Sequence, residues 1–172
     1  MSAKTLCFSG HRPEKLPHKG DESSVAIGNL KSLLYKEIYD SITDGYTEFI
    51  TGLSRGVDIW AANMVLEFKN KNPNLKLICA RPYRGFGDER TGYEKWELFH
   101  ILEKADEIVD ISPYYADGCM KKRNFYMVDR SSKLIAVVKD YYSGTGQTIR
   151  YAVKKGLCVK IIDISKNVEL FI

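Results

Sequence analysis

The segment Ile50-Thr51-Gly52-Leu53-Ser54-Arg55-Gly56-Val57-Asp58 passes from a short apolar run, through a turn with two glycines, into a helical pattern. A strand that leads through a glycine turn into a helix is how open α/β sheets hold anionic ligands. Small residues let backbone N–H groups approach an anion, and the helix N-terminus adds partial positive charge. The segment therefore favours an α/β fold with a ligand site at this turn.

Two more turns of this kind stand elsewhere in the chain. One is Phe8-Ser9-Gly10-His11-Arg12, which follows the first apolar run, and the other is Ser143-Gly144-Thr145-Gly146-Gln147-Thr148. The carboxyl ends of parallel strands meet at one edge of a sheet, so we expect all three turns to lie there. Together they make a nucleotide-like ligand the leading hypothesis.

Apolar runs alternate with helical patterns along the chain. Short apolar runs predict strands at residues 5–9, 47–51, 75–80, 107–111, 133–139 and 158–164. Apolar positions at helical spacing predict helices at residues 27–42, 57–68, 96–102, 120–132 and 147–155. Strands separated by helix-length connections form parallel sheets covered on both faces, with right-handed crossovers. We expect one Rossmann-like α/β domain over residues 1–172, a three-layer, doubly wound, mainly parallel sheet with helices on both faces.

The overall composition is that of an ordinary globular protein. Of the 172 residues, 44% are apolar and 28% charged, and the net charge of +4 permits nucleic-acid binding without requiring it. No apolar run reaches membrane-spanning length and no signal peptide is recognisable, so we expect a cytoplasmic protein with no membrane partner.

The four cysteines form no CxxC pair, and the three histidines have no metal-ligand spacing. Cys7, Cys79 and Cys158 lie in or beside apolar runs, where a free cysteine behaves as a small buried hydrophobe. We expect no metal site.

The candidate ligand-binding residues come from the three turns and from the basic and aromatic stretch 122–130. They are Ser9, Gly10, His11, Arg12, Gly52, Leu53, Ser54, Arg55, Gly56, Asp58, Asn124, Ser143, Gly144, Thr145 and Gly146. The phosphate is expected on the turn from Gly52 to Gly56, with arginines pairing in forked geometry. Asp58, Asn124 and Thr145 are candidates for contacts to the sugar or base.

Simpler interpretations stay open at each position. The glycines could supply only turn dihedral angles, and Asp58 could be an acid that complements the helix dipole. The turn from Ser143 to Thr148 could be an ordinary loop with a threonine N-cap. His11 could contact the ligand or act as a general base, but the sequence shows no partner for it, so no catalytic residue is assigned.

Three motifs in this order resemble the bacterial YpsA-type family, once called DUF1273. They are Phe8-Ser9-Gly10-His11-Arg12-Pro13, the segment 51–58, and Arg123-Asn124-Phe125-Tyr126-Met127-Val128-Asp129. That family belongs to the SLOG group of Rossmann-like proteins, which includes the LOG and DprA proteins. The resemblance covers nearly the whole chain and implies a nucleotide or nucleotide-derivative pocket.

Two relatives within that group sharpen the alternatives. Segment 51–58 is similar to the SGLARGID motif of DprA proteins, which bind single-stranded DNA, but no aromatic stacking platform with a basic groove is evident. LOG phosphoribohydrolases carry a PGGxGTxxE motif, whereas here Arg150 and Tyr151 stand where the glutamate should fall. Without that carboxylate we do not expect phosphoribohydrolase activity.

The sequence thus predicts a protein that binds a nucleotide or dinucleotide-type ligand, as a sensor or binding module rather than an enzyme. The alternatives are a nucleotide-processing hydrolase or transferase that uses His11 or Asp58, and a DprA-like protein that binds single-stranded DNA. A homo-oligomer stays open, since exposed tyrosines could form a pairing surface.

Overall fold

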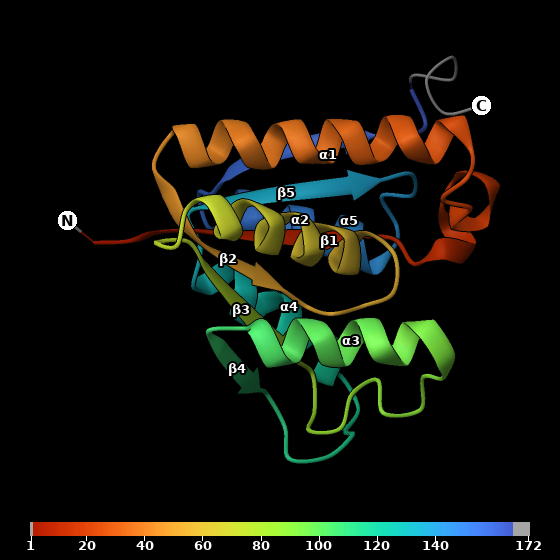
Figure 1. Cartoon of the computed structure of the whole chain (residues 1–172), viewed down its shortest axis with the longest axis vertical. Helices are drawn as coiled ribbons and strands as arrows, with labels where there is room; N and C mark the ends of the chain where they lie inside the picture. The colour runs from red at the N-terminus through yellow and green to blue at the C-terminus, as the bar shows by residue number, and fades with distance from the viewer. Residues whose placement is uncertain (1, 167–172) are drawn as a thin grey trace.

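The computed structural model describes residues 2–166, in which a six-stranded sheet lies between two layers of helices (Figure 1). The strands are β1 (Lys4–Gly10), β2 (Tyr46–Thr51), β3 (Lys76–Arg81), β4 (Glu107–Asp110), β5 (Lys133–Val138) and β6 (Cys158–Asp163). The helices are α1 (Val25–Thr43), α2 (Val57–Lys71), α3 (Gly92–Lys104), α4 (Cys119–Asp129) and α5 (Gly144–Lys154), with short 3-10 turns η1 (Pro13–Lys15) and η2 (Pro17–Gly20).

The strand order is β4-β3-β2-β1-β5-β6, and all five pairings between the described strands are parallel. The chain runs outward from β1 to β4 and then crosses back to place β5 on the other side of β1. The connections after β1 and β5 therefore leave in opposite directions. In an open α/β sheet, such a reversal opens a crevice beyond the carboxyl ends of the two strands.

The helices are divided between the two faces of the sheet, with α1, α2 and α3 in front and α4 and α5 behind in Figure 1. Side chains alternate along β1: Leu6 and Phe8 are packed in the front core, and Cys7 in the rear core. All three are fully buried, as expected for a central strand covered on both faces. The doubly wound, three-layer prediction is confirmed.

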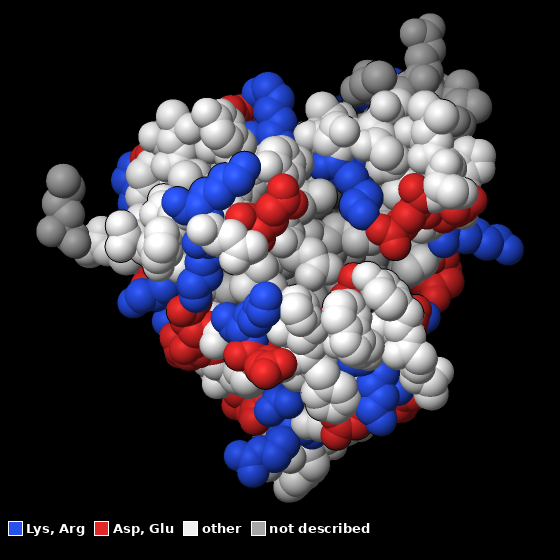
Figure 2. Space-filling view, in the orientation of Figure 1, with Lys and Arg blue, Asp and Glu red and all other residues white. Residues whose placement is uncertain are grey.

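Figure 2 shows the front face, on which acidic and basic side chains are interspersed. Among residues 2–166, no helix combines the length and the apolar character needed to cross a bilayer.

Several details differ from the sequence predictions. Helix α3 begins at Gly92 rather than at residue 96, and α4 ends at Asp129 rather than at residue 132. Helix α5 begins at Gly144 rather than at residue 147, because the Ser143 hydroxyl caps it by accepting a hydrogen bond from Gly146 N at 3.3 Å. The third glycine turn is thus the first turn of a helix, and its cap is a serine rather than a threonine. The predicted burial of Cys158 is wrong: this residue lies on the edge strand β6 and is exposed.

Candidate ligand-binding crevice

A crevice of about 390 Å³ lies at the carboxyl end of β1, bounded by the first turns of α2, α4 and α5. Segments distant in sequence meet here because β1 and β5 are neighbours in the sheet. Ten of the predicted residues line it: Ser9, Gly10, His11, Arg12, Ser54, Asp58, Asn124, Ser143, Gly144 and Thr145. The structure therefore brings most of the three turns together at one place.

Five predicted residues do not line the crevice, namely Gly52, Leu53, Arg55, Gly56 and Gly146. Leu53 is fully buried in the front core. The Arg55 guanidinium lies 3.1 Å from a Glu14 carboxylate oxygen and 3.9 Å from one of Glu94, so it is already paired. Gly56 is the N-cap of α2 with φ of +92°, and a side chain there would meet the His11 carbonyl oxygen.

Gly52 has a different role from the one its motif predicts. A Cβ atom at Gly52 would lie 2.5 Å from Nη1 of Arg123, so the space beside this glycine is filled by a guanidinium. Arg123 donates to the Gly52 carbonyl oxygen through Nη1, and to Ser54 Oγ through Nη2 at 3.4 Å. The close approach that glycine permits here is made by the protein's own arginine.

Arg123 is the main residue of the crevice that the candidate set did not include. It lies in the first turns of α4, is 4% exposed, and donates from Nε to Asn124 Oδ1 at 2.9 Å. Burial lowers its pKa, and the nearby Asp58 carboxylate partly offsets that effect. Its place in the basic stretch 122–130 was visible in the sequence, but its burial against a turn 71 residues away was not.

Asp58 has a buried carboxylate oxygen whose hydrogen-bonding capacity the described residues leave unused. It lies in the first turn of α2 and is 5% exposed, and Oδ2 accepts a hydrogen bond from Ser54 N at 3.3 Å. Its other oxygen, Oδ1, is buried and has no hydrogen-bond partner among the described residues. Burial raises the pKa of Asp58 to about 6, although the positive charges of Arg123, Arg90 and Arg12 act to lower it. An unpaired carboxylate oxygen in such a place favours a donor supplied by a ligand.

Other residues that line the crevice are suited to an anion. Arg12 is exposed at the end of β1 and forms no ion pair with a described residue. Gly144 and Thr145 form the first turn of α5, where backbone N–H groups have no intrahelical acceptor. The crevice thus combines one free guanidinium, a helix N-terminus and one unpaired carboxylate oxygen.

His11 is fixed by the backbone rather than free for catalysis. Its Nε2 accepts hydrogen bonds from the amides of Lys139 at 2.9 Å and Asp140 at 3.3 Å. Burial lowers the pKa of His11, because it disfavours the charged ring. Since its acceptor nitrogen is already used, the ring holds the end of β1 against the loop after β5. This geometry gives no support to a general base here.

A scan against protein families gives a match to the YspA SLOG family over residues 6–163. The chain belongs to this family. The resemblance drawn from the three motifs is therefore confirmed. A UPF0398 protein of Bacillus cereus (strain G9842) is 28% identical over 160 residues, which cover 88% of this chain and 83% of that protein. A UPF0398 protein of Bacillus thuringiensis (strain Al Hakam) is 27% identical over 159 residues, with the same coverage.

Among solved structures, DNA processing protein A from Helicobacter pylori has a similar fold, with a TM-score of 0.58 at 18% sequence identity. The superposition covers 93% of this chain and 65% of that chain. The Helicobacter protein binds single-stranded DNA. At this identity the similarity shows a shared fold, in agreement with the SLOG assignment.

Proposed function

We propose that the crevice binds a nucleotide or nucleotide-derived ligand and that the protein acts as a binding or sensor module. The observation that carries the proposal is the buried, unpaired Oδ1 of Asp58 in a crevice that Arg12 and Arg123 also line. A sugar hydroxyl would donate to this oxygen, and phosphate oxygens would accept from Arg12 and from the N-terminus of α5. In this proposal the phosphate lies beside Arg12 and the N-terminus of α5 rather than on the turn at Gly52, where Arg123 already lies.

Binding without catalysis fits the described groups best. His11 has no free acceptor nitrogen, and among the described residues the Asp58 carboxylate is hydrogen-bonded to Ser54 N and to no second acid or histidine that could share proton transfer. No cluster of three His, Cys, Asp or Glu residues in the described part of the chain could hold a metal ion.

The test is calorimetric titration at pH 7.5 with adenine and guanine mono- and diphosphates and NAD, alongside 2′,3′-dideoxy forms of the mononucleotides. We expect Asp58→Asn to weaken binding of a ribonucleotide about tenfold, because a hydrogen bond to a charged acceptor is lost. The dideoxy form should bind both proteins equally, since it lacks the hydroxyl that Asp58 would accept from. Equal affinity of the unaltered protein for the ribose and dideoxy forms would refute this role of Asp58.

The phosphate arm is tested with Arg12→Ala, which should weaken binding of the nucleotide but not of the parent nucleoside. Lys104→Ala removes an exposed cation at the end of α3, outside the crevice, and is the matched control. If Arg12→Ala and Lys104→Ala bind the nucleotide alike, the phosphate does not lie beside Arg12.

Single-stranded DNA binding is the second candidate, favoured by the fold shared with DNA processing protein A. The structure offers it limited support, because the cluster Lys121-Lys122-Arg123 presents only its two lysines while Arg123 is buried. A DNA-binding protein should retain an oligonucleotide with an affinity that falls steeply with salt. Retention with a steep salt slope and no nucleotide binding would replace the first proposal with this one.

A further inference from the structure

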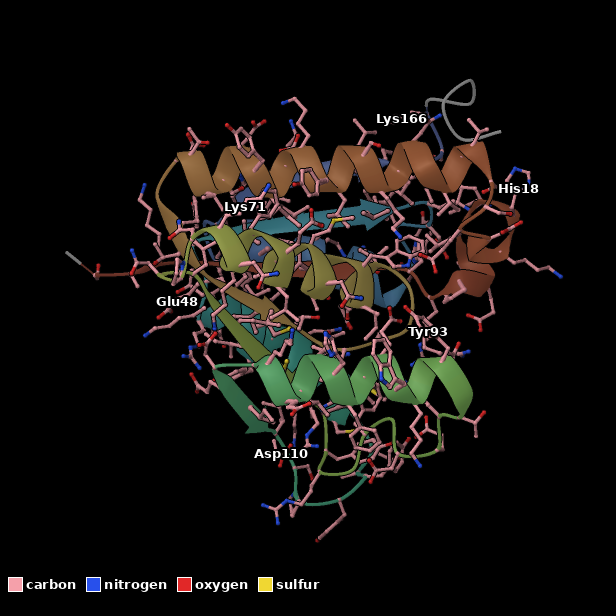
Figure 3. The ribbon with its side chains drawn as sticks, viewed as in Figure 1. His18, Glu48, Lys71, Tyr93, Asp110 and Lys166 are labelled. Atoms are coloured by element: carbon pink, nitrogen blue, oxygen red, sulfur yellow. The ribbon has the colours of Figure 1, made fainter. Side chains whose placement is uncertain are left out.

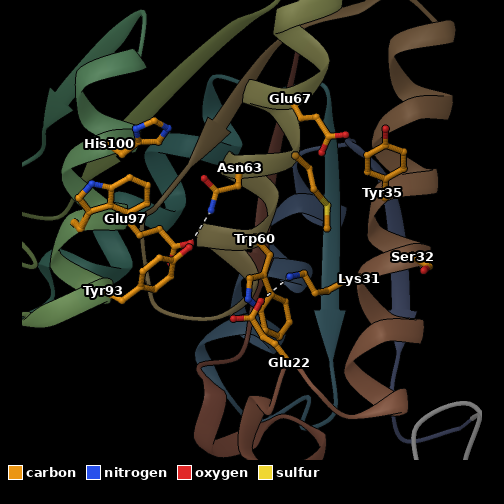
Figure 4. Close-up of a pocket in the computed structure, with 12 residues that line it drawn as sticks. Glu22, Lys31, Ser32, Tyr35, Trp60, Asn63, Glu67, Tyr93, Glu97 and His100 are labelled. Carbon is orange, nitrogen blue, oxygen red and sulfur yellow. Dashed lines mark hydrogen bonds and ion pairs between the residues drawn. The ribbon is translucent and has the colours of Figure 1, made fainter.

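A larger cavity, of about 660 Å³, lies on the front face and shares no lining residue with the crevice. Figure 4 shows it as a groove with α2 as its floor and α1 and α3 as its walls. Its charged lining consists of three carboxylates and one ammonium group, belonging to Glu22, Glu67, Glu97 and Lys31. The groove is therefore acidic, whereas the crevice carries the free arginine.

The wall formed by α3 carries a row of stacked rings. The Tyr93 and Trp96 rings are 5.6 Å apart at 28°, and the Trp96 and His100 rings are 5.0 Å apart at 16°. Tyr93 is 67% exposed and Trp96 is 58% exposed, and Figure 3 places Tyr93 at the start of α3. Large exposed rings that border a cavity are typical of binding surfaces.

The groove already contains one cation of its own, a lysine ammonium. The Lys31 ammonium lies 5.4 Å from the Trp60 ring centroid and 2.6 Å from a Glu22 carboxylate oxygen (Figure 4). A cation there contacts both an aromatic face and an acid. Trp60 is only 6% exposed, and its indole N–H donates no hydrogen bond to another described residue.

A second acid of the groove, Glu97, lies within electrostatic reach of both Glu22 and Lys31. Glu97 on α3 accepts a hydrogen bond from Asn63 Nδ2 at 3.0 Å, and partial burial raises its pKa. Neither Glu97 nor Glu67 forms an ion pair with any residue between 2 and 166. These two carboxylates leave the groove with negative charge that a basic segment would offset, because a guanidinium pairs with carboxylates in a forked geometry.

We propose that this groove binds a basic segment of a partner protein, with arginine side chains paired with Glu97 and Glu67. The open groove between two helices can admit an extended chain, and its negative charge disfavours a nucleic acid or a phosphorylated ligand. The inference is independent of what the crevice binds.

The chain has two tryptophans, and both line the groove, so intrinsic tryptophan fluorescence reports on this site. The probe is the acetylated and amidated peptide Gly-Arg-Gly-Arg-Gly. Its partner probe has citrulline, an uncharged analogue of the same shape, in place of each arginine. We expect a saturable change with the arginine peptide and none with the citrulline peptide.

Glu67→Gln and Glu97→Gln should each weaken the binding of the arginine peptide about tenfold. The second change keeps an oxygen that can accept from Asn63. Glu103→Gln alters an exposed carboxylate of the same helix outside the groove and should bind as the unaltered protein does. Arg12→Ala, which tests the crevice, should also leave peptide binding unchanged.

No saturable change with the arginine peptide would overturn the proposal. Equal binding of the citrulline peptide would show that charge is not recognised and would also overturn it. Tighter binding of free spermidine than of the peptide would contradict a protein segment as the occupant.

Discussion

Replacing Asp58 with asparagine should stabilise the ligand-free protein at neutral pH and leave its stability nearly unchanged in acid. The carboxyl group is 5% exposed, and one of its oxygens has no hydrogen-bond partner among the described residues. Burial outweighs the attraction of three arginines and raises the pKa of Asp58 from 3.8 to about 6. Asparagine has nearly the same shape as the protonated acid, so it removes the buried charge while keeping an acceptor for Ser54 N.

The magnitude follows from the difference in pKa between the folded and unfolded chains. A carboxyl whose pKa is higher in the folded chain stabilises the fold while it is protonated. This stabilisation is complete below pH 3.8 and is lost as the pH rises through about 6. A shift of about two pH units corresponds to about 3 kcal/mol. For a domain of this size, that is a rise in Tm of about 6–12 °C for Asp58→Asn above pH 7.

Urea unfolding of both proteins at intervals from pH 3 to pH 8 measures this difference directly. The stability gained by Asp58→Asn should be near zero at pH 3 and should grow to its full value by about pH 7. Asp117→Asn changes an exposed carboxylate in the same way and should stay within about 0.5 kcal/mol of the unaltered protein. A difference that does not vary with pH, or an Asp58→Asn protein that is less stable at pH 7.5, would refute the reasoning.

Two more predictions concern the packing around the crevice. Gly52→Ala should destabilise the protein by about 1–3 kcal/mol, because its Cβ would overlap the buried Arg123 guanidinium. Gly28→Ala, on α1 with open space around it, should instead stabilise by about 0.5–1 kcal/mol, and thermal unfolding that moves both variants the same way would contradict this explanation. The NMR signals of the His11 ring should titrate with a pKa below 6.5, so that its contribution to stability is present above pH 6.5 and is lost as the pH falls below it. Titration of His11 above 6.5 would show that Nε2 is not held by the two amides.

The sheet could be predicted because each strand and helix leaves a local signal. Leu6 and Phe8 point to one face of β1 and Cys7 to the other, and uninterrupted apolar runs of this kind belong to strands covered on both sides. The start of α5 was predicted late because glycines at residues 144 and 146 weaken the helical pattern, while the cap at Ser143 sets the start.

The crevice was predicted less completely. The positions of Ser9, Arg12 and Ser143 at strand ends were enough to place them at one edge of the sheet. Their partners were not visible, because the motif at Gly52 looks the same whether a ligand or Arg123 occupies the space beside it.

The order of residues by itself determined the α/β class, the parallel strands and the collection of three glycine turns at one edge, since these follow from periodicity and turn chemistry over a few residues. Only the tertiary structure decided that Arg123 fills the space beside Gly52, that Arg55 is paired, and that Oδ1 of Asp58 is left without a partner. Arg123 and Gly52 are 71 residues apart, and their pairing depends on how the helices pack on the sheet. The local sequence around either residue does not indicate it.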